Sequence, residues 1–353
     1  MRRLPLLSAL AALLTLLLAP ARLAADLVWT PQDGWKVEGG ALAQFAGEEG
    51  RNGLDAMNKA RAAEEAHSNR AALKLYNSVY KKYPNSVFAA EALFRAGRIY
   101  QQNQEYYKAF TTFQQMVARY PNSEKFTQVI GEQYRIAADL FAGKRARLWG
   151  WLPGFKNRER ALEYFETIVA TAPYSDYAPL SLMNAARGYK DVGETEAAVD
   201  ALDRMINTYP RSVLTPDAYL KIAETHSSLV DGPAYDQAST KQAITYYEDY
   251  MILFPGDAGM VQAETGLAKM KTVLAQSKLT IADYYYKYRK NYQAAKVFYN
   301  EAITVYPDSD VAKVAREKLV DVNAKLDGQA AAAAGQPAPK APEPKKKKRL
   351  WLF

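Results

Sequence analysis

The sequence predicts an all-α fold, a right-handed superhelical solenoid of about six helix-turn-helix units. Two observations support this prediction. Prolines recur at spacings of 37 to 52 residues, and the residues before each proline repeat in step with it. The prolines in question are Pro84, Pro121, Pro173, Pro210, Pro255 and Pro307.

An alanine stands twelve residues before every one of these prolines, and a large apolar residue stands eight before it. The alanines are Ala72, Ala109, Ala161, Ala198, Ala243 and Ala295, and the large residues are Tyr76, Phe113, Phe165, Leu202, Tyr247 and Tyr299. Positions four residues apart share one face of an α-helix. Proline cannot continue the helical hydrogen bonds and disfavours helical geometry in the residue before it, so each helix is expected to end there.

The segment after each proline predicts the start of the next helix. In YPNS (83–86 and 120–123) and YPDS (306–309), the Asn or Asp and the Ser are expected to cap that helix. Thirteen residues after the prolines stand Gly97, Tyr134, Ala186, Ala223, Ala268 and Val320. Four of these six are small, which would let the two antiparallel helices of a unit pack closely. The alternative, a bundle of unrelated amphipathic helices, requires no alanine in register.

The complete pattern resembles the tetratricopeptide repeat: a small residue and a tyrosine, then alanine and an aromatic, then proline, over a nominal 34 residues. The repeats are expected to run from about residue 50 to 327. The longer intervals between prolines indicate insertions, of which residues 143–157 are the clearest.

The beginning of the chain reads as an export signal. Arg2 and Arg3 precede an uncharged, predominantly apolar run of 16 residues, and small residues follow it as far as Ala25. The run is shorter than the roughly 20 residues that span a bilayer, so residues 1–25 are expected to be a cleaved signal peptide, with an uncleaved anchor as the alternative. Residues 26–49 are expected to form an extended strap against the first helices, with a disordered leader as the alternative.

Charge and composition exclude several classes of function. The net charge of +8 belongs to the two ends, because residues 26–339 carry 37 basic and 37 acidic side chains, and no nucleic-acid partner is expected. The two histidines, His67 and His226, stand in no arrangement that indicates a triad or a metal site. We therefore expect no catalytic residue, no metal, no cofactor and no enzymatic activity.

The second half of the chain resembles the outer-membrane protein assembly factor BamD (YfiO) family. The resemblance rests on residues 246–319, and especially on Leu274, Ala275, Ile281, Ala282, Tyr285, Tyr286, Tyr292, Ala294 and Ala295. It runs more loosely from about residue 60 to 326. The chain differs from the family in one respect. Members are typically anchored through a lipidated cysteine, and these 353 residues contain no cysteine.

The resemblance implies a non-enzymatic periplasmic scaffold, held peripherally at the outer membrane, that takes part in β-barrel assembly. It implies binding to a BamA-like barrel protein and other assembly subunits through the C-terminal repeats, and to unfolded outer-membrane proteins through the N-terminal ones. The alternative is a periplasmic repeat protein of the Tol–Pal associated type, which coordinates envelope constriction or wall synthesis. For the partner side we expect Tyr284, Tyr288 and Arg289, and for a peptide groove Arg95, Arg98 and Tyr107.

Two segments outside the repeats combine basic and aromatic residues. The insertion 143–157 holds Trp149, Trp151 and Phe155, and the tail 328–353, read as a disordered linker with a basic tip, ends in Lys345, Lys346, Lys347, Lys348, Arg349, Trp351 and Phe353. Both are candidate contacts with an anionic membrane surface. The alternatives are that the tryptophans pack back onto the solenoid and that the tail is simply solvated.

Overall fold

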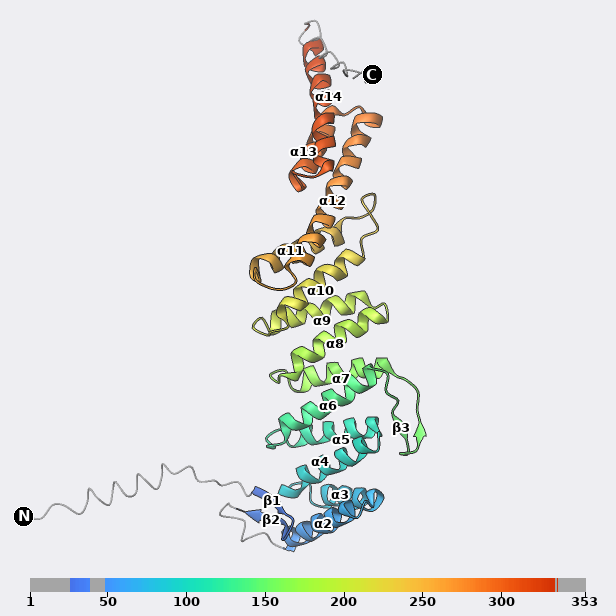
Figure 1. Ribbon diagram of the computed structural model, residues 1–353, viewed down its shortest axis with the longest axis vertical. Helices are drawn as coiled ribbons and strands as arrows, with labels where there is room; N and C mark the ends of the chain where they lie inside the picture. The colour runs from blue at the N-terminus through green and yellow to red at the C-terminus, as the bar shows by residue number, and fades with distance from the viewer. Residues whose placement is uncertain (1–25, 39–47, 334, 336–353) are drawn as a thin grey trace, which may run out of the picture. The chain divides into compact units, whose positions relative to one another are not determined.

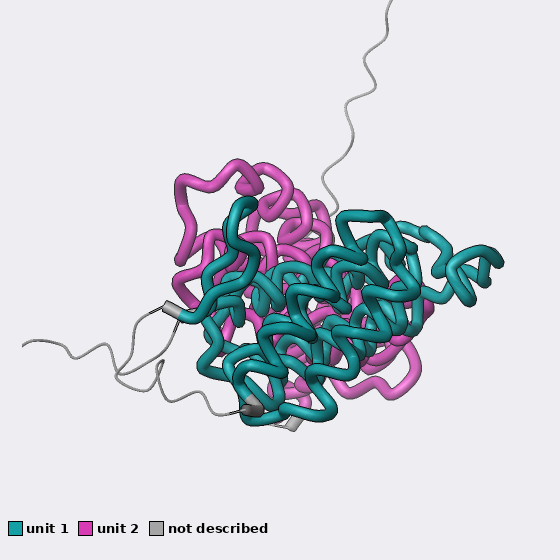
Figure 2. Tube along the Cα trace, turned by 90° about the horizontal axis from the view of Figure 1, so that it is seen from below, with its two compact units in different colours: residues 1–188 teal, residues 189–353 magenta. Residues whose placement is uncertain are grey.

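The fold consists of successive α-helices, most of which are joined by short turns (Figure 1). The computed structural model describes residues 26–38, 48–333 and 335. The chain consists of two compact units, of which the first ends at Gly188 and the second begins at Tyr189 (Figure 2).

The first unit carries all the strands of the described residues. Its elements are β1 (Asp26–Thr30), β2 (Gly34–Glu38), α2 (Glu48–Glu65), α3 (Asn69–Lys82), α4 (Val87–Gln102), α5 (Tyr106–Arg119), α6 (Phe126–Phe141), β3 (Arg147–Leu148), β4 (Leu152–Pro153), α7 (Arg158–Thr171) and most of α8 (Tyr177–Asp191). In the second unit follow α9 (Thr195–Thr208), α10 (Thr215–Ser228), α11 (Ala238–Leu253), α12 (Met260–Tyr284), the π-helix η2 (Tyr285–Arg289), α13 (Tyr292–Val305) and α14 (Asp310–Ala333).

The repeat register predicted from the prolines is the core of the fold. All six alanines and all six large apolar residues of the register are buried. They lie on α3, α5, α7, α9, α11 and α13, and each of these helices ends directly before the residue that precedes the proline. The all-α tetratricopeptide-repeat solenoid expected from the sequence is therefore confirmed.

The residue two positions after each proline closes a turn. Its backbone N–H donates to the carbonyl of the residue before the proline at all six sites, over 2.9–3.2 Å. Capping, as predicted, occurs at Ser309, whose hydroxyl oxygen accepts from the N–H of Ala312 at 3.1 Å. At Ser86 the capping prediction is wrong: this hydroxyl makes no cap bond and donates to the Tyr83 carbonyl at 2.7 Å. The hydroxyl is thus a second donor to the carbonyl that already accepts from the Ser86 N–H.

Small residues sit where helices approach most closely, although not always at the expected position. A Cβ added to Gly97 on α4 would come within 2.4 Å of the Phe113 ring on α5, so only glycine fits there. Between α11 and α12 the same role falls to Gly266, beside Tyr247, rather than to Ala268. In the last repeat the expected position fails, since Val320 is exposed.

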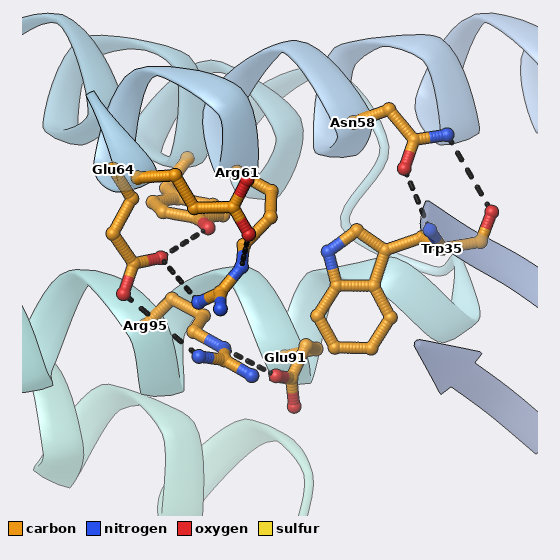
Figure 3. A network of polar contacts seen from close by, with 8 residues as sticks. Trp35, Asn58, Arg61, Glu64, Glu91 and Arg95 are labelled. Carbon is orange, nitrogen blue, oxygen red and sulfur yellow. Dashed lines mark hydrogen bonds and ion pairs between the residues drawn. The ribbon is translucent and has the colours of Figure 1, made fainter. Parts of the chain in front are cut away.

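The segment expected to be an extended strap contains an antiparallel hairpin, in which β1 pairs with β2 and Trp29 lies opposite Trp35. The hairpin packs on α2 and α4, with Trp35 buried. The backbone N–H of Trp35 donates to Asn58 Oδ1 at 2.7 Å, and this hydrogen bond joins β2 to α2 (Figure 3).

One boundary differs from the expectation, and the insertion contains secondary structure of its own. Helix α14 continues to Ala333, past the expected end of the solenoid at residue 327. The insertion at 143–157 contains a second small hairpin, β3 with β4. Within the described ranges no helix is long and apolar enough to cross a membrane.

Candidate partner-binding surfaces

Arg95, expected in a peptide groove, is held in an internal polar network (Figure 3). Its Nε lies 2.8 Å from Glu91 Oε1, and its guanidinium lies 5.4 Å from the centre of the Trp35 ring. Glu64 extends the network by accepting from the Tyr76 hydroxyl at 2.7 Å. Burial and the hydrogen bond to Glu64 raise the pKa of Tyr76. Arg95 thus joins the first hairpin to the repeats.

Arg98 belongs to a second polar cluster, centred on the buried carboxylate of Glu132. Arg98 Nη1 lies 2.5 Å from Glu132 Oε1, while Arg135 and Gln101 bind Oε2 at 2.7 and 2.9 Å. Arg98 and Glu132 are 34 residues apart, the nominal length of one repeat. Sequence reasoning missed this pair, although a separation close to one repeat length places the two residues on corresponding helices of neighbouring repeats, α4 and α6.

Tyr107, the third groove candidate, belongs to neither of these polar clusters. It is half-buried on α5, in a shallow depression that also contains Tyr80, Tyr100 and Lys108. Lys108 Nζ lies 5.5 Å from the centre of the Tyr100 ring and 2.5 Å from Glu105. The three residues expected to form one groove therefore lie in three different environments.

The three residues expected on the partner side lie together where α12 passes into η2. Tyr284 is half exposed and Tyr288 is 76% exposed, and their ring centres are 5.9 Å apart. Arg289, also exposed, ends the π-helix. Between them Tyr285 stacks against Phe298 of α13, with ring centres 5.5 Å apart. One tyrosine thus anchors the turn while its neighbours face solvent.

Backbone geometry holds this turn in place. Lys290, directly after η2, has a left-handed backbone with φ of 52°, and the Asn291 N–H donates to the Tyr285 carbonyl at 3.1 Å. The Asn291 side chain then caps α13 by accepting from the N–H of Ala294 at 3.0 Å. A π-turn and a left-handed residue are local interruptions that often occur at functional positions.

Asp283, one residue before Tyr284, joins three helices. Its carboxylate accepts from the Tyr299 hydroxyl of α13 at 2.5 Å and from Lys318 Nζ of α14 at 2.6 Å. Burial raises the pKa of Asp283, but the hydrogen bonds from Lys318 and Tyr299 outweigh it, so the pKa lies below its ordinary value. The aspartate is therefore charged at neutral pH and fixes the position of the exposed tyrosines beside it.

The insertion places its aromatic residues in solvent. Trp149, Trp151 and Phe155 are 71%, 70% and 89% exposed, so the alternative that the tryptophans pack back onto the solenoid is wrong. The other membrane candidates, Lys345, Lys346, Lys347, Lys348, Arg349, Trp351 and Phe353, lie outside the described residues.

The fold and its buried register define the class of this chain, a tetratricopeptide-repeat solenoid, and a model of that repeat matches residues 91–123. A second family model, YfiO, described as outer membrane lipoprotein, matches residues 155–336. That segment is more than half of the chain, and the chain belongs to the YfiO family. It contains the whole Tyr284–Arg289 turn.

Curated relatives of this chain carry the name outer membrane protein assembly factor BamD. The protein from Xylella fastidiosa (strain 9a5c) is 23% identical over 155 residues, which cover 41% of this chain and 53% of that protein. The protein from Caulobacter vibrioides is 26% identical over 132 residues, covering 37% of this chain and 43% of that protein. The chain thus spans about half the length of the curated relatives it matches.

Among solved structures, a tetratricopeptide repeat protein from Parabacteroides merdae aligns with 78% of this chain and 100% of its own at 11% identity, with a TM-score of 0.31. A likeness this distant carries no argument about function.

Proposed function

We propose that this chain is a non-enzymatic scaffold for the assembly of β-barrel proteins in the outer membrane, acting in the periplasm after export. The observation that carries the proposal is that residues 155–336 match the YfiO family and that its curated relatives are named as assembly factors. None of the relatives named above is a constriction or wall-synthesis protein, so nothing supports the alternative of the Tol–Pal associated type.

The surface proposed to dock a partner is the turn formed by Tyr284, Tyr288 and Arg289, and the partner is a BamA-like barrel protein. Tyrosine and arginine are among the residues that contribute most to protein interfaces, because each combines a large contact area with a polar group. Here two exposed rings lie 5.9 Å apart on a turn that is held by Asp283 and Asn291. Such a turn loses little conformational freedom when a partner binds.

The proposed contact with unfolded outer-membrane proteins lies in the first unit. Arg95 and Arg98 are engaged by buried carboxylates, so they are positioning residues rather than contacts. The depression beside Tyr107 is the better candidate, since Tyr80 and Tyr100 border it and Lys81 adds a cation. Aromatic rings with an adjacent cation suit extended, partly apolar segments with an acidic residue.

The proposal is tested by affinity purification of the chain from envelope extracts, with and without the double substitution Tyr284→Ala, Tyr288→Ala. We expect the wild-type chain to recover a BamA-like barrel protein, and the double variant to recover at least about tenfold less, because truncating both interface tyrosines costs about 2 kcal/mol or more together. Tyr235→Ala removes an exposed tyrosine elsewhere in the same unit and serves as the matched control.

Recovery of wall synthases or Tol–Pal components in place of a barrel protein would contradict the proposed function. Recovery of the barrel protein at equal levels by the wild-type chain and the double variant would leave the family role intact and contradict the docking surface alone.

A further inference from the structure

The hairpin of residues 146–154 projects an aromatic tip from the first unit. Strands β3 and β4 pair in the register Arg147 with Pro153 and Leu148 with Leu152, and the turn between them consists of Trp149, Gly150 and Trp151. Both tryptophans are largely exposed, and so is Phe155 beyond the second strand. The tip therefore presents three aromatic side chains that the protein itself does not cover.

The base of the hairpin is attached firmly to the repeats. Ala146 is fully buried, and the N–H of Arg147 donates to the Gln104 carbonyl, before α5, at 2.8 Å. The N–H of Gly154 donates to the Ala146 carbonyl at 2.8 Å, and a Cβ on Gly154 would come within 2.7 Å of that same oxygen. The exposed tip thus stands on a defined base.

The backbone of the turn is unusual for the residue that occupies it. Trp149 has a φ of 55° and Gly150 a φ of 80°, both in the left-handed region. Glycine adopts this region readily, but for a bulky residue it is an outlier. A tryptophan that is both exposed and sterically disfavoured contributes little to folding, so a role in binding explains its presence better.

The charge around the tip is positive and mostly uncompensated. Between residues 144 and 158 there are five basic residues and no acidic one. Lys144 pairs with Asp139 at 2.9 Å, whereas Arg145, Arg147, Lys156 and Arg158 are exposed and form no ion pair with any described residue. The nearest carboxylate to Gly150 is that of Glu105, which is buried and already bound to Lys108.

We call the segment from Trp149 to Phe155, with its three exposed aromatic side chains, the aromatic tip. We infer that the aromatic tip is a peripheral contact with the anionic headgroup surface of a phospholipid bilayer. Tryptophan favours the membrane–water interface, where its ring enters the apolar boundary and its N–H stays hydrated. Exposed Lys and Arg side chains add attraction to anionic headgroups, and a tip without acidic residues meets no repulsion there. The inference does not depend on the proposed partner, because the tip and the Tyr284–Arg289 turn belong to different units.

The test measures vesicle binding of residues 26–353, which contain every element that the structure describes. The probes are phosphatidylcholine vesicles with and without phosphatidylglycerol, measured by co-sedimentation. The main variant is Trp149→Gly, Trp151→Ser, which removes both rings and places a residue suited to positive φ at 149. The matched control is Tyr174→Ser, which removes a fully exposed aromatic side chain elsewhere in the first unit.

We expect the wild-type chain and the Tyr174 control to bind the anionic vesicles, and the tip variant to bind on the order of tenfold more weakly. A second variant, Arg145→Gln, Arg147→Gln, keeps the rings and should reduce the difference between anionic and neutral vesicles by a similar factor. Brominated lipids should quench the fluorescence of the wild-type chain more than that of the tip variant.

Equal vesicle binding by the wild-type chain and the tip variant would overturn the inference, because any adhesion would then come from elsewhere in the chain. So would a concentration-dependent dimer in the absence of vesicles that the tip variant abolishes, since the tip would then be a contact between two copies. Far-UV circular dichroism of each variant checks that the helices are unchanged.

Discussion

Glu132 is the residue on which the polar packing between α4 and α6 depends. Its buried carboxylate binds Arg98 and Gln101 of α4 and Arg135 of its own helix. Removing one member of such a cluster leaves the remaining charges without their partner in a partly desolvated place. The cluster therefore matters more for stability than an ion pair at the surface does.

Replacing Glu132 by Ala is expected to lower the free energy of unfolding by about 2–3 kcal/mol. This loss in the free energy of unfolding is smaller than for a fully buried pair, because Arg98 and Arg135 are partly exposed and water can solvate their charges in the variant. Glu163→Ala breaks the exposed pair with Arg160 and should change stability by less than about 1 kcal/mol. Urea unfolding followed by circular dichroism compares the two, and equal effects would show that Glu132 has no special role.

At the scale of single elements, the junction of α12, α13 and α14 depends on one aspartate. Asp283 accepts hydrogen bonds from Tyr299 and Lys318, and its pKa in the folded chain is lower than the ordinary value. A carboxyl with a lowered folded pKa contributes stability that is present above its unfolded pKa, near 4, and is lost as the pH falls through the folded value.

Asp283→Asn should therefore lower stability by about 2 kcal/mol at pH 7. The gap between wild type and variant should narrow as the pH falls below about 4 and close below the lowered pKa of the folded chain, where the wild-type carboxyl is neutral in both states. Asp327→Asn, on the exposed face of α14, is the matched control and should show little gap at any pH. A gap that stays constant from pH 7 to pH 3 would contradict the role assigned to the charge.

The sequence predicted the helices far better than the connecting elements. The proline register predicts the helix ends for two reasons. Proline cannot continue a helix, and the same pattern recurs in every repeat, so that each copy supports the others. The two hairpins have no such redundancy. Trp149, a bulky residue in a left-handed turn, runs against the usual turn preferences, so no local rule would have placed it there. The Arg95 side chain contacts Glu91 and Trp35, and the contact with Trp35 is visible only in three dimensions.

At the scale of the whole molecule, the chain combines a generic repeat fold with a few features of its own. The repeats bury an alanine and a large apolar residue at the same two positions six times, which builds the framework but says little about partners. We propose that two interruptions of the repeat contribute to specificity: the π-helix after α12 and the hairpin between α6 and α7. The family match to residues 155–336 includes the first of these features.

The most direct test of the proposed scaffold role is site-specific photocrosslinking in intact cells, with a photoreactive residue at Tyr288 and, for comparison, at Tyr235. Both side chains are exposed and both lie in the second unit, so only their position distinguishes them. We predict that the residue at 288 crosslinks to a BamA-like barrel protein and that the residue at 235 does not. Crosslinks at 288 only to proteins outside the assembly machinery, or to the barrel protein equally from both positions, would contradict the account.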